Sequence, residues 1–210
     1  MKIVEKYSGL IWSVCYEGEK KDTFSKLFRQ WTDAEQLTKF FTKHQRFLCG
    51  NLYFAGLSVK EVIMNALSEA RGFRRDFTQY YWNERNGIHP DFDDRFVILN
   101  SRSGKDDLKR KMYGHLQDET QMPSVFRLYA VKVPSEKKKE PPAYIITGGG
   151  IKLTDSMHQM KELAREYTKI ETVQDWLERN GIFTKEQLID FQKKYAEQAN
   201  DRMGKTGAED

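Results

Sequence analysis

Two strand-like segments in the second half of the chain carry side chains suited to metal-independent cleavage of RNA. Arg127 and Tyr129 alternate onto one face of the first segment, and the second carries Tyr144 and then Lys152, with His158 in the turn that follows. The 2′-hydroxyl of RNA is an internal nucleophile, and a lysine or tyrosine whose pKa is lowered by nearby cations can take its proton. An arginine would stabilise the phosphate charge, and a histidine or lysine would protonate the leaving oxygen. The alternative is that these cations are only solvated.

Three glycines, Gly148–Gly150, interrupt the second segment just before Lys152. They do not match the G-x-x-x-x-G-K-[ST] spacing of a phosphate-binding loop, and the chain contains no G-x-G-x-x-G fingerprint. Glycines inside a strand indicate a bulge, a sharp bend, or the close approach of another backbone. We therefore expect the triplet to shape the strand rather than to bind a nucleotide.

Other kinds of catalytic site find little support. The four histidines are scattered, and the two cysteines do not join them in any metal-ligand spacing. No G-x-S-x-G nucleophile motif is present, and Cys15 lies in a predicted strand, where we expect a core position. We therefore expect no metal site and no cofactor.

The distribution of charge favours a polyanionic partner for the middle of the chain. The net charge is +4 overall, made up of +7 over residues 1–154 and −3 over residues 155–210. The alternative is a loop region kept in solution by its lysines. If the basic region contacts RNA, the residues that we expect to do so are Arg102, Lys105, Lys109, Arg110, Lys111 and Lys132. All but the last lie in a segment that reads as an exposed loop or a frayed short helix.

The order of elements predicts an α+β fold. A strand hairpin over the first 16 residues is followed by helical patterns, a weakly patterned stretch, a strand pair, and helices again. We expect a small antiparallel sheet, made of the N-terminal hairpin and the C-terminal strand pair, packed on several helices. The 13 Phe, 10 Tyr and 4 Trp supply an aromatic core. The predicted helical ranges are 24–31, 34–48, 58–86, 157–167, 173–180 and 184–195, with N-caps at Asp33 and Ser58 and a capping box at Thr184 and Gln187.

These patterns divide the chain into a main domain over residues 1–168, with a helical insertion at about 58–122, and a helical extension over residues 169–199. Residues 200–210 are expected to form a disordered tail. No apolar run approaches the ~20 residues that a membrane-spanning helix needs, and the first residues lack the apolar core of a signal peptide. We expect a cytoplasmic protein with no membrane partner; the oligomeric state stays open.

Residues 126–133 and 144–157 together resemble a group of Bacteroidetes proteins that are similar to the RelE/HigB toxin superfamily. Residues 31–44 resemble a segment found in the same group. The pattern of HigB-type toxins is an arginine-bearing strand, a hairpin, and a strand that ends in lysine and threonine. Arg127 matches the arginine, and Lys152 and Thr154 match the lysine and threonine.

The resemblance implies an endoribonuclease that cleaves mRNA on the ribosome, with a small antiparallel sheet packed on helices and a cognate antitoxin as inhibitor. Arg127 would bind the scissile phosphate, Lys152 would act in proton transfer or charge stabilisation, and Tyr129 or His158 would assist. The implied partners are the ribosome, mRNA and the antitoxin.

Two other classes of function remain compatible with the sequence. The chain has one lysine where the toxins often have two, a long segment at 58–122, and an acidic helical end. These features favour a non-catalytic module that uses a toxin-like sheet to bind RNA or a protein. A structural or regulatory protein without any nucleic acid is the third reading.

Overall fold

The computed structural model describes residues 1–7, 9–49, 54, 56–85, 95–99, 108–114, 124–153 and 161–206. His158, Arg102, Lys105 and Thr154 therefore lie outside the described residues. Within the described part, no helix is both long enough and apolar enough to cross a bilayer.

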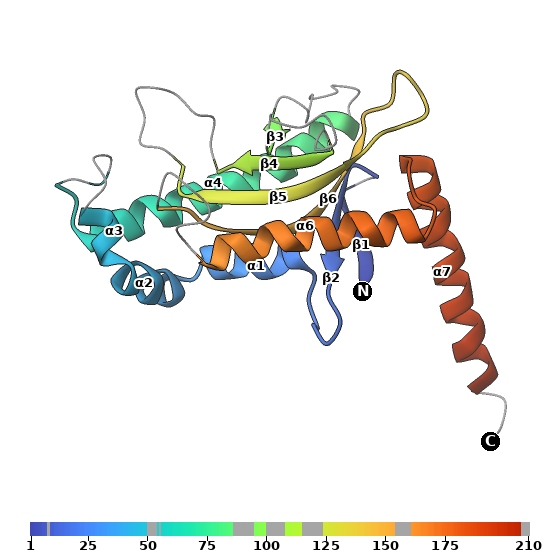
Figure 1. Ribbon diagram of the computed structural model, residues 1–210, viewed down its shortest axis with the longest axis horizontal. Coiled ribbons are helices and arrows are strands. Elements are labelled where there is room, and N and C mark those ends of the chain that lie inside the picture. Colours follow the sequence, from blue (N-terminus) through green and yellow to red (C-terminus); the bar gives the residue numbers. More distant parts are fainter. Residues whose placement is uncertain are drawn as a thin grey trace.

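A six-stranded, mostly antiparallel sheet forms the centre of the molecule (Figure 1). All neighbouring strands are antiparallel except β2 and β6, which are parallel. The predicted mixture of helices with a mainly antiparallel sheet is confirmed, but the expectation of a small sheet is wrong, because β3 and β4 extend it beyond β5. In the order β1-β2-β6-β5-β4-β3, the strands are β1 Lys2–Tyr7, β2 Ile11–Cys15, β6 Ala143–Ile151, β5 Phe126–Val133, β4 Lys109–Tyr113 and β3 Val97–Ile98.

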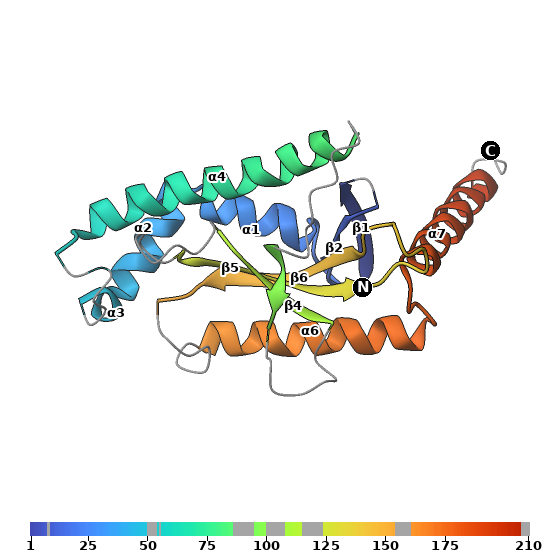
Figure 2. The ribbon, with the colours of Figure 1, turned by 90° about the horizontal axis from the view of Figure 1, so that it is seen from above.

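Helices cover both faces of this sheet. Figure 2 shows α1, α2 and α4 on one face and α6 on the other, while α7 leaves the body beyond the edge that carries β1. The arrangement is therefore three-layered over the middle of the sheet. The helices are α1 Thr23–Trp31, α2 Ala34–Lys43, α3 Gln45–Cys49, α4 Val59–Arg85, α6 Lys161–Arg179 and α7 Lys185–Thr206.

Side chains at the helix N-termini accept hydrogen bonds from backbone N–H groups, as the sequence predicts. Asp33 accepts hydrogen bonds from the backbone of Glu35 and Gln36, at 2.9 and 3.1 Å. At the start of α7, Thr184 and Gln187 bond reciprocally, so the predicted capping box is confirmed. The helix predicted over 34–48 is divided at His44, which ends α2 before α3 begins.

An aromatic layer fills the space between the sheet and the helices α1 and α4. Phe28 is 1% exposed, and its ring centroid lies 5.4 Å from that of Phe73 on α4. Trp31 lies 4.7 Å from Phe126 on β5 and therefore joins this layer to the sheet. Burial of such rings stabilises the packing of α1 and α4 against the sheet.

The stretch from 88 to 122, whose sequence pattern is weak, contributes two strands where the structure describes it. Lys109, Arg110 and Lys111 lie in β4 and pair with β5, not in an exposed loop or a frayed helix. Residue 168, the expected end of the main domain, lies within α6, which packs against β5 and β6. The helix α7 continues to Thr206, into the range expected to be a disordered tail.

The parallel pairing between β2 and β6 is short. Within the described residues it joins Ile11–Ser13 to Tyr144–Ile146, and β6 then continues to Ile151. Beyond the pairing, the Tyr16 hydroxyl donates to the carbonyl oxygen of Thr147 at 2.7 Å. A bulge also falls there, because Tyr129 pairs with Gly148 while Ala130 pairs with Ile146. The edge of β6 at its glycine end thus lies beside no other strand of the described structure.

Candidate functional site

Four side chains of β4 and β5 share the face of the sheet that α6 covers. Tyr113 pairs with Arg127 and Lys111 with Tyr129, so alternation places all four on one side. Arg127 and Tyr129, which sequence alternation places together, are therefore neighbours, and the two β4 residues join them.

The Arg127 guanidinium is buried and is held by backbone carbonyl oxygens. Its Nη1 donates to the carbonyl oxygens of Ser124 (2.5 Å) and Phe126 (2.8 Å), and its centre lies 4.2 Å from the Tyr113 ring centroid. The residue is 9% exposed, and no described carboxylate forms an ion pair with it. Burial lowers the pKa of Arg127, although a guanidinium stays charged in proteins. The site therefore holds a cation that forms no ion pair within the described residues, although the nearby Glu69 carboxylate favours its charged form and, against the effect of burial, raises the pKa of Arg127.

The Tyr129 hydroxyl lies beside this cation and lacks a hydrogen-bond partner within the described structure. The residue is 1% exposed, and burial, with Glu166 adding to it, raises the pKa of Tyr129 well above its usual value. A tyrosine with a raised pKa keeps its proton at neutral pH, so Tyr129 can donate a hydrogen bond but is a poor general base. Arg127 and Tyr129 thus place a guanidinium beside a neutral, fully buried hydroxyl.

Lys152 follows the end of β6, close to the same end of the sheet. Its backbone N–H donates to the carbonyl oxygen of Val125 at 2.8 Å, and the strand pairing places Gly150 opposite Arg127. The side chain of Lys152 is half-buried. Of the four residues predicted to be catalytic, the structure thus brings Arg127, Tyr129 and Lys152 to one end of the sheet, and His158 is not described.

The cations predicted to bind RNA are placed less uniformly. Lys109 is 7% exposed, and its Nζ lies 3.3 Å from Glu171 and 3.2 Å from the Tyr167 hydroxyl, both on α6. Arg110 is 8% exposed and bonds the backbone carbonyl of Lys109. Both side chains are therefore buried in the interior of the molecule. Lys111 and Lys132 are half-buried and keep part of their surface in solvent.

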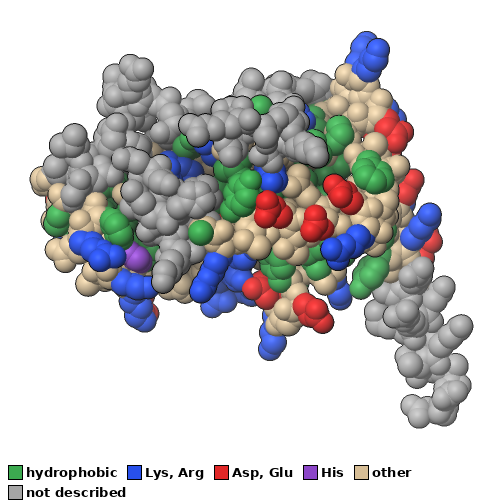
Figure 3. Space-filling model, viewed as in Figure 1, with side chains coloured by type: hydrophobic (Ala, Val, Ile, Leu, Met, Phe, Trp, Pro, Cys, Tyr) green, Lys and Arg blue, Asp and Glu red, His purple; other side chains and the backbone are tan. Residues whose placement is uncertain are grey.

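The surface around these residues carries charge of both signs. On the face drawn in Figure 3, acidic side chains lie among lysines and arginines. Exposed residues of α6 include Arg165 and Arg179 as well as Glu171, Asp175 and Glu178. The described part of this face therefore forms no uniform basic patch, and any affinity for a polyanion must come from specific contacts.

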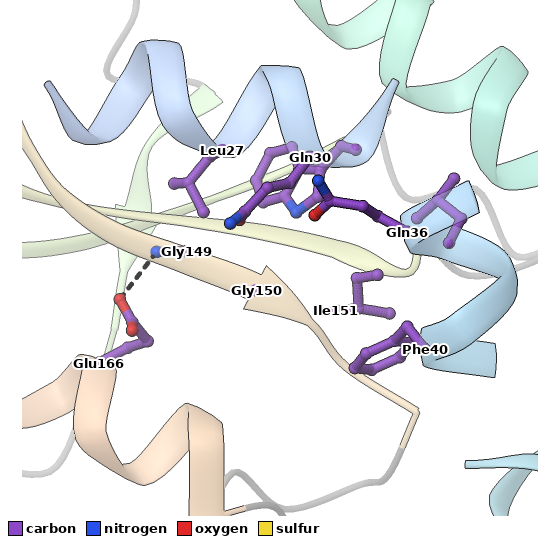
Figure 4. Close-up of a pocket in the computed structure, with 10 residues that line it drawn as sticks. Leu27, Gln30, Gln36, Phe40, Gly149, Gly150, Ile151 and Glu166 are labelled. Carbon is purple, nitrogen blue, oxygen red and sulfur yellow. Dashed lines mark hydrogen bonds between the residues drawn. The ribbon is translucent and has the colours of Figure 1, made fainter. Parts of the chain in front are cut away.

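A groove lies along the edge of β6 at its glycine end, with residues of α1 and α2 on one side and Glu166 of α6 on the other (Figure 4). Its cavity volume is about 270 Å³. The sequence gives no direct signal for it, because its residues come from three separate stretches of the chain; only the glycine triplet, expected to allow a close approach, marks one wall. The lining residues are Leu27, Gln30, Trp31, Gln36, Leu37, Phe40, Gly149, Gly150, Ile151 and Glu166.

Comparison with known proteins returns nothing: no protein-family model, curated protein or solved structure matches the chain. In the described residues, no group of three or more His, Cys, Asp or Glu side chains is arranged to hold a metal ion. The function must therefore be inferred from the geometry of the site itself.

Proposed function

We propose that this protein is a non-catalytic RNA-binding module that holds a backbone phosphate at Arg127. The observation that carries this proposal is the buried guanidinium with no carboxylate partner among the described residues. A buried charge is costly unless it is paired, and arginine is the side chain best suited to phosphate oxygens.

Binding is favoured over cleavage by the chemistry of the groups around Arg127. Cleavage through the 2′-hydroxyl needs a base to take its proton, and the raised pKa of Tyr129 removes the nearest candidate. The Arg127 Nη1 atom is already bonded to two carbonyl oxygens, which fixes the guanidinium for binding. A fixed donor of this kind can hold an anion without taking part in proton transfer.

A second proposal is the RelE/HigB-like toxin that the sequence resemblance implies, acting on mRNA at the ribosome. The observation that favours it is that Arg127 and Tyr129 share one face, with Lys152 at the end of the paired strand. In that case Lys152 has to supply the proton transfer that Tyr129 does not.

Fluorescence anisotropy with a labelled single-stranded RNA tests the first proposal. We expect Arg127→Lys to weaken binding about tenfold, because an ammonium replaces a fixed planar fork. For Arg127→Met we expect the slope of log affinity against log salt to fall by about 0.7, the contribution of one phosphate contact on a single strand. Arg74→Met, at an exposed position of α4, is the matched control and should change the affinity less than about twofold.

Thermal unfolding of each variant separates a binding role from a structural one. A folded Arg127→Met protein that binds RNA as tightly as the unaltered chain contradicts the proposal. Mapping of new 5′ ends in a purified translation system tests the second proposal. Codon-linked cuts that disappear in Lys152→Ala would establish the endoribonuclease, and an intact message at saturating protein would exclude it.

A further inference from the structure

The groove beside β6 exposes a strand edge to a potential partner. The Gly149 N–H donates to Glu166 Oε2 at 3.1 Å, so it points away from β5 and toward the groove. Backbone groups of alternate residues in a strand point to the same edge, which places the N–H and C=O of Ile151 on this side too. The pairing with β2 ends at Ile146 within the described structure. The edge from Gly149 to Ile151 is thus the kind of surface to which an extended chain adds as a further strand.

The glycines allow such a chain to approach. Gly149 and Gly150 have no side chains, so the edge between Thr147 and Ile151 is bare backbone on the groove side. Side chains take the place of the missing strand here: the Tyr16 hydroxyl bonds Thr147 O, and the Glu166 carboxylate bonds Gly149 N. Each is one hydrogen bond, which the backbone of an incoming strand could replace, or beside which it could form further hydrogen bonds.

On the side of α1 and α2, the walls of the groove suit an apolar side chain of the added strand, and the next side chain points toward α6. Leu27, Trp31 and Leu37 are buried, and Phe40 and Ile151 close one end (Figure 4). A cavity of about 270 Å³ lies just under the usual size range of small-molecule sites, roughly 300–1,000 Å³, and is better matched to one side chain.

On the α6 side of the groove, the Glu166 carboxylate provides an acceptor for a basic head group, which would share it with Lys169. Glu166 is the one ionisable residue among its described lining, and the amides of Gln30 and Gln36 add neutral acceptors at the mouth. Glu166 Oε1 contacts Lys169 Nζ at 2.6 Å and Oε2 accepts from Gly149. A carboxylate offers about four lone-pair sites, so both oxygens can accept a further hydrogen bond.

We propose that this groove binds an extended polypeptide segment that adds to the edge of β6 and places an arginine or lysine side chain against Glu166. The proposal uses residues distinct from Arg127 and Tyr129 and is independent of the RNA-binding proposal. The partner is thus a basic, strand-forming peptide, and the recognition combines backbone hydrogen bonds, an apolar channel and one carboxylate.

A capped five-residue peptide with a central arginine between valine and threonine residues is the probe. Two matched peptides carry citrulline at the centre, which removes only the charge, or N-methyl groups on the backbone, which remove the strand-forming donors. Binding is measured by calorimetry, and the site is mapped from the backbone ¹⁵N shifts of Gly149, Gly150 and Ile151. We expect the arginine peptide to bind and each matched peptide to bind about tenfold more weakly, the effect of losing a charged or buried hydrogen bond.

Two protein variants complete the test. Glu166→Gln keeps an oxygen for Gly149 but removes the charge, and we expect it to bind the arginine and citrulline peptides equally. Glu35→Gln changes a carboxylate on α2 that is 76% exposed and outside the groove, so it should leave the preference for arginine unchanged. Thermal unfolding confirms that each variant is folded.

Several outcomes would overturn the proposal. They are no binding of the arginine peptide at low-millimolar concentration, equal binding of the citrulline or N-methyl peptide, and an unchanged preference in Glu166→Gln. Peptide-induced shifts that map away from β6 would show that the peptide does not bind in the groove. Shifts of the groove residues that follow protein concentration without any peptide would show that a second copy of this chain occupies it.

Discussion

Phe28 lies at the centre of the aromatic layer between the sheet and the helices. Its ring lies 4.6 Å from Phe24, 5.3 Å from Trp31 and 5.4 Å from Phe73, measured between ring centroids. We expect Phe28→Ala to lower the free energy of unfolding by about 3–5 kcal/mol, because it removes a buried ring and leaves a cavity. Urea denaturation measures this. Met64→Ala, at a position that is 60% exposed, should change stability by less than about 0.5 kcal/mol.

Tyr129, which is buried, and Tyr16, which is half-buried, make stability depend on pH in the alkaline range. Burial raises the pKa of both Tyr16 and Tyr129 above the usual value, and nearby glutamates add to the effect. The unfolded tyrosines ionise near pH ~10, so above that pH the folded state binds more protons than the unfolded state. Stability should then fall as pH rises, by up to ~1.4 kcal/mol per pH unit for each tyrosine.

Chemical denaturation at a series of pH values from neutral to alkaline measures this slope. Tyr129→Phe should reduce it, and at neutral pH the same variant should be at least as stable as the unaltered chain, because its hydroxyl has no partner in the described structure. A slope that is unchanged in Tyr129→Phe would contradict the assignment.

At the residue scale, sequence alternation is enough to place Arg127 and Tyr129 on one face, because side chains in a strand alternate. It does not show that α6 covers that face, nor that Lys109 is held in the interior by Glu171 and Tyr167. A basic side chain is usually exposed, so the burial of Lys109 depends on partners that lie far away in the sequence.

The strand β6 contains three consecutive glycines, and the first two, Gly148 and Gly149, should respond differently to substitution. A Cβ on Gly149 would lie 2.7 Å from the backbone oxygen of Arg127 and 2.8 Å from Leu27, whereas a Cβ on Gly148 would meet the carboxylate of Glu166. A carboxylate at the end of a flexible side chain can move, but a paired strand cannot. We expect Gly149→Ala to cost about 1–3 kcal/mol in stability and Gly148→Ala to cost less.

Thermal unfolding of the two variants side by side checks this order. Gly148→Ala should also shift the backbone amide signal of Gly149, because Glu166 has to leave its hydrogen bond. Equal loss of stability in both variants would contradict the expected difference in room for a Cβ atom at the two positions.

At the element scale, periodicity predicts the strands and helices that carry a regular apolar pattern, among them β5 and α1. It misses β4, whose sequence KRKMY is mostly basic. The pairing of β4 with β5 supplies the hydrogen bonds, and Met112 supplies the buried side chain. Strand formation of this kind is decided by neighbouring strands, and local propensity does not reveal it.

At the scale of the whole molecule, α7 is attached through its first turns. The Lys185 N–H donates to the carbonyl oxygen of Pro134 at 2.8 Å, Ser135 donates to Glu186 at 2.7 Å, and Leu188 is fully buried. Residues 193–197 are exposed, and the helix then runs away from the body (Figure 1). We expect a chain ended after Glu197 to unfold within about 2 °C of the full chain, because the contacts that attach α7 lie in its first turns.

Circular dichroism melts of the shortened chain measure this, with Leu188→Ala as the comparison. That substitution removes a buried side chain at the attachment and should lower the unfolding temperature by about 10 °C. A shortened chain that melts as early as Leu188→Ala would place the stabilising contacts in the distal turns of α7.

The layered arrangement could be predicted only in part. The order of strands and helices indicates an α+β fold, and the structure agrees at that level. The parallel contact between β2 and β6, and the groove that results where it stops, depend on segments that are distant in the sequence. No local pattern encodes them, because they follow from how the layers pack.

That parallel contact has a consequence for how the chain acquires its structure. Ile11 pairs with Tyr144, so β1 and β2 can join the rest of the sheet only after β6 has been synthesised. Contacts between distant segments are slow to form, because a long loop must close first. On the ribosome, the backbone hydrogen-bonding groups at the edge of β2 therefore stay unpaired with β6 while the helices α1, α2 and α4 emerge. An exposed strand edge of this kind can pair with another chain, so the nascent hairpin is prone to aggregation until β6 is available.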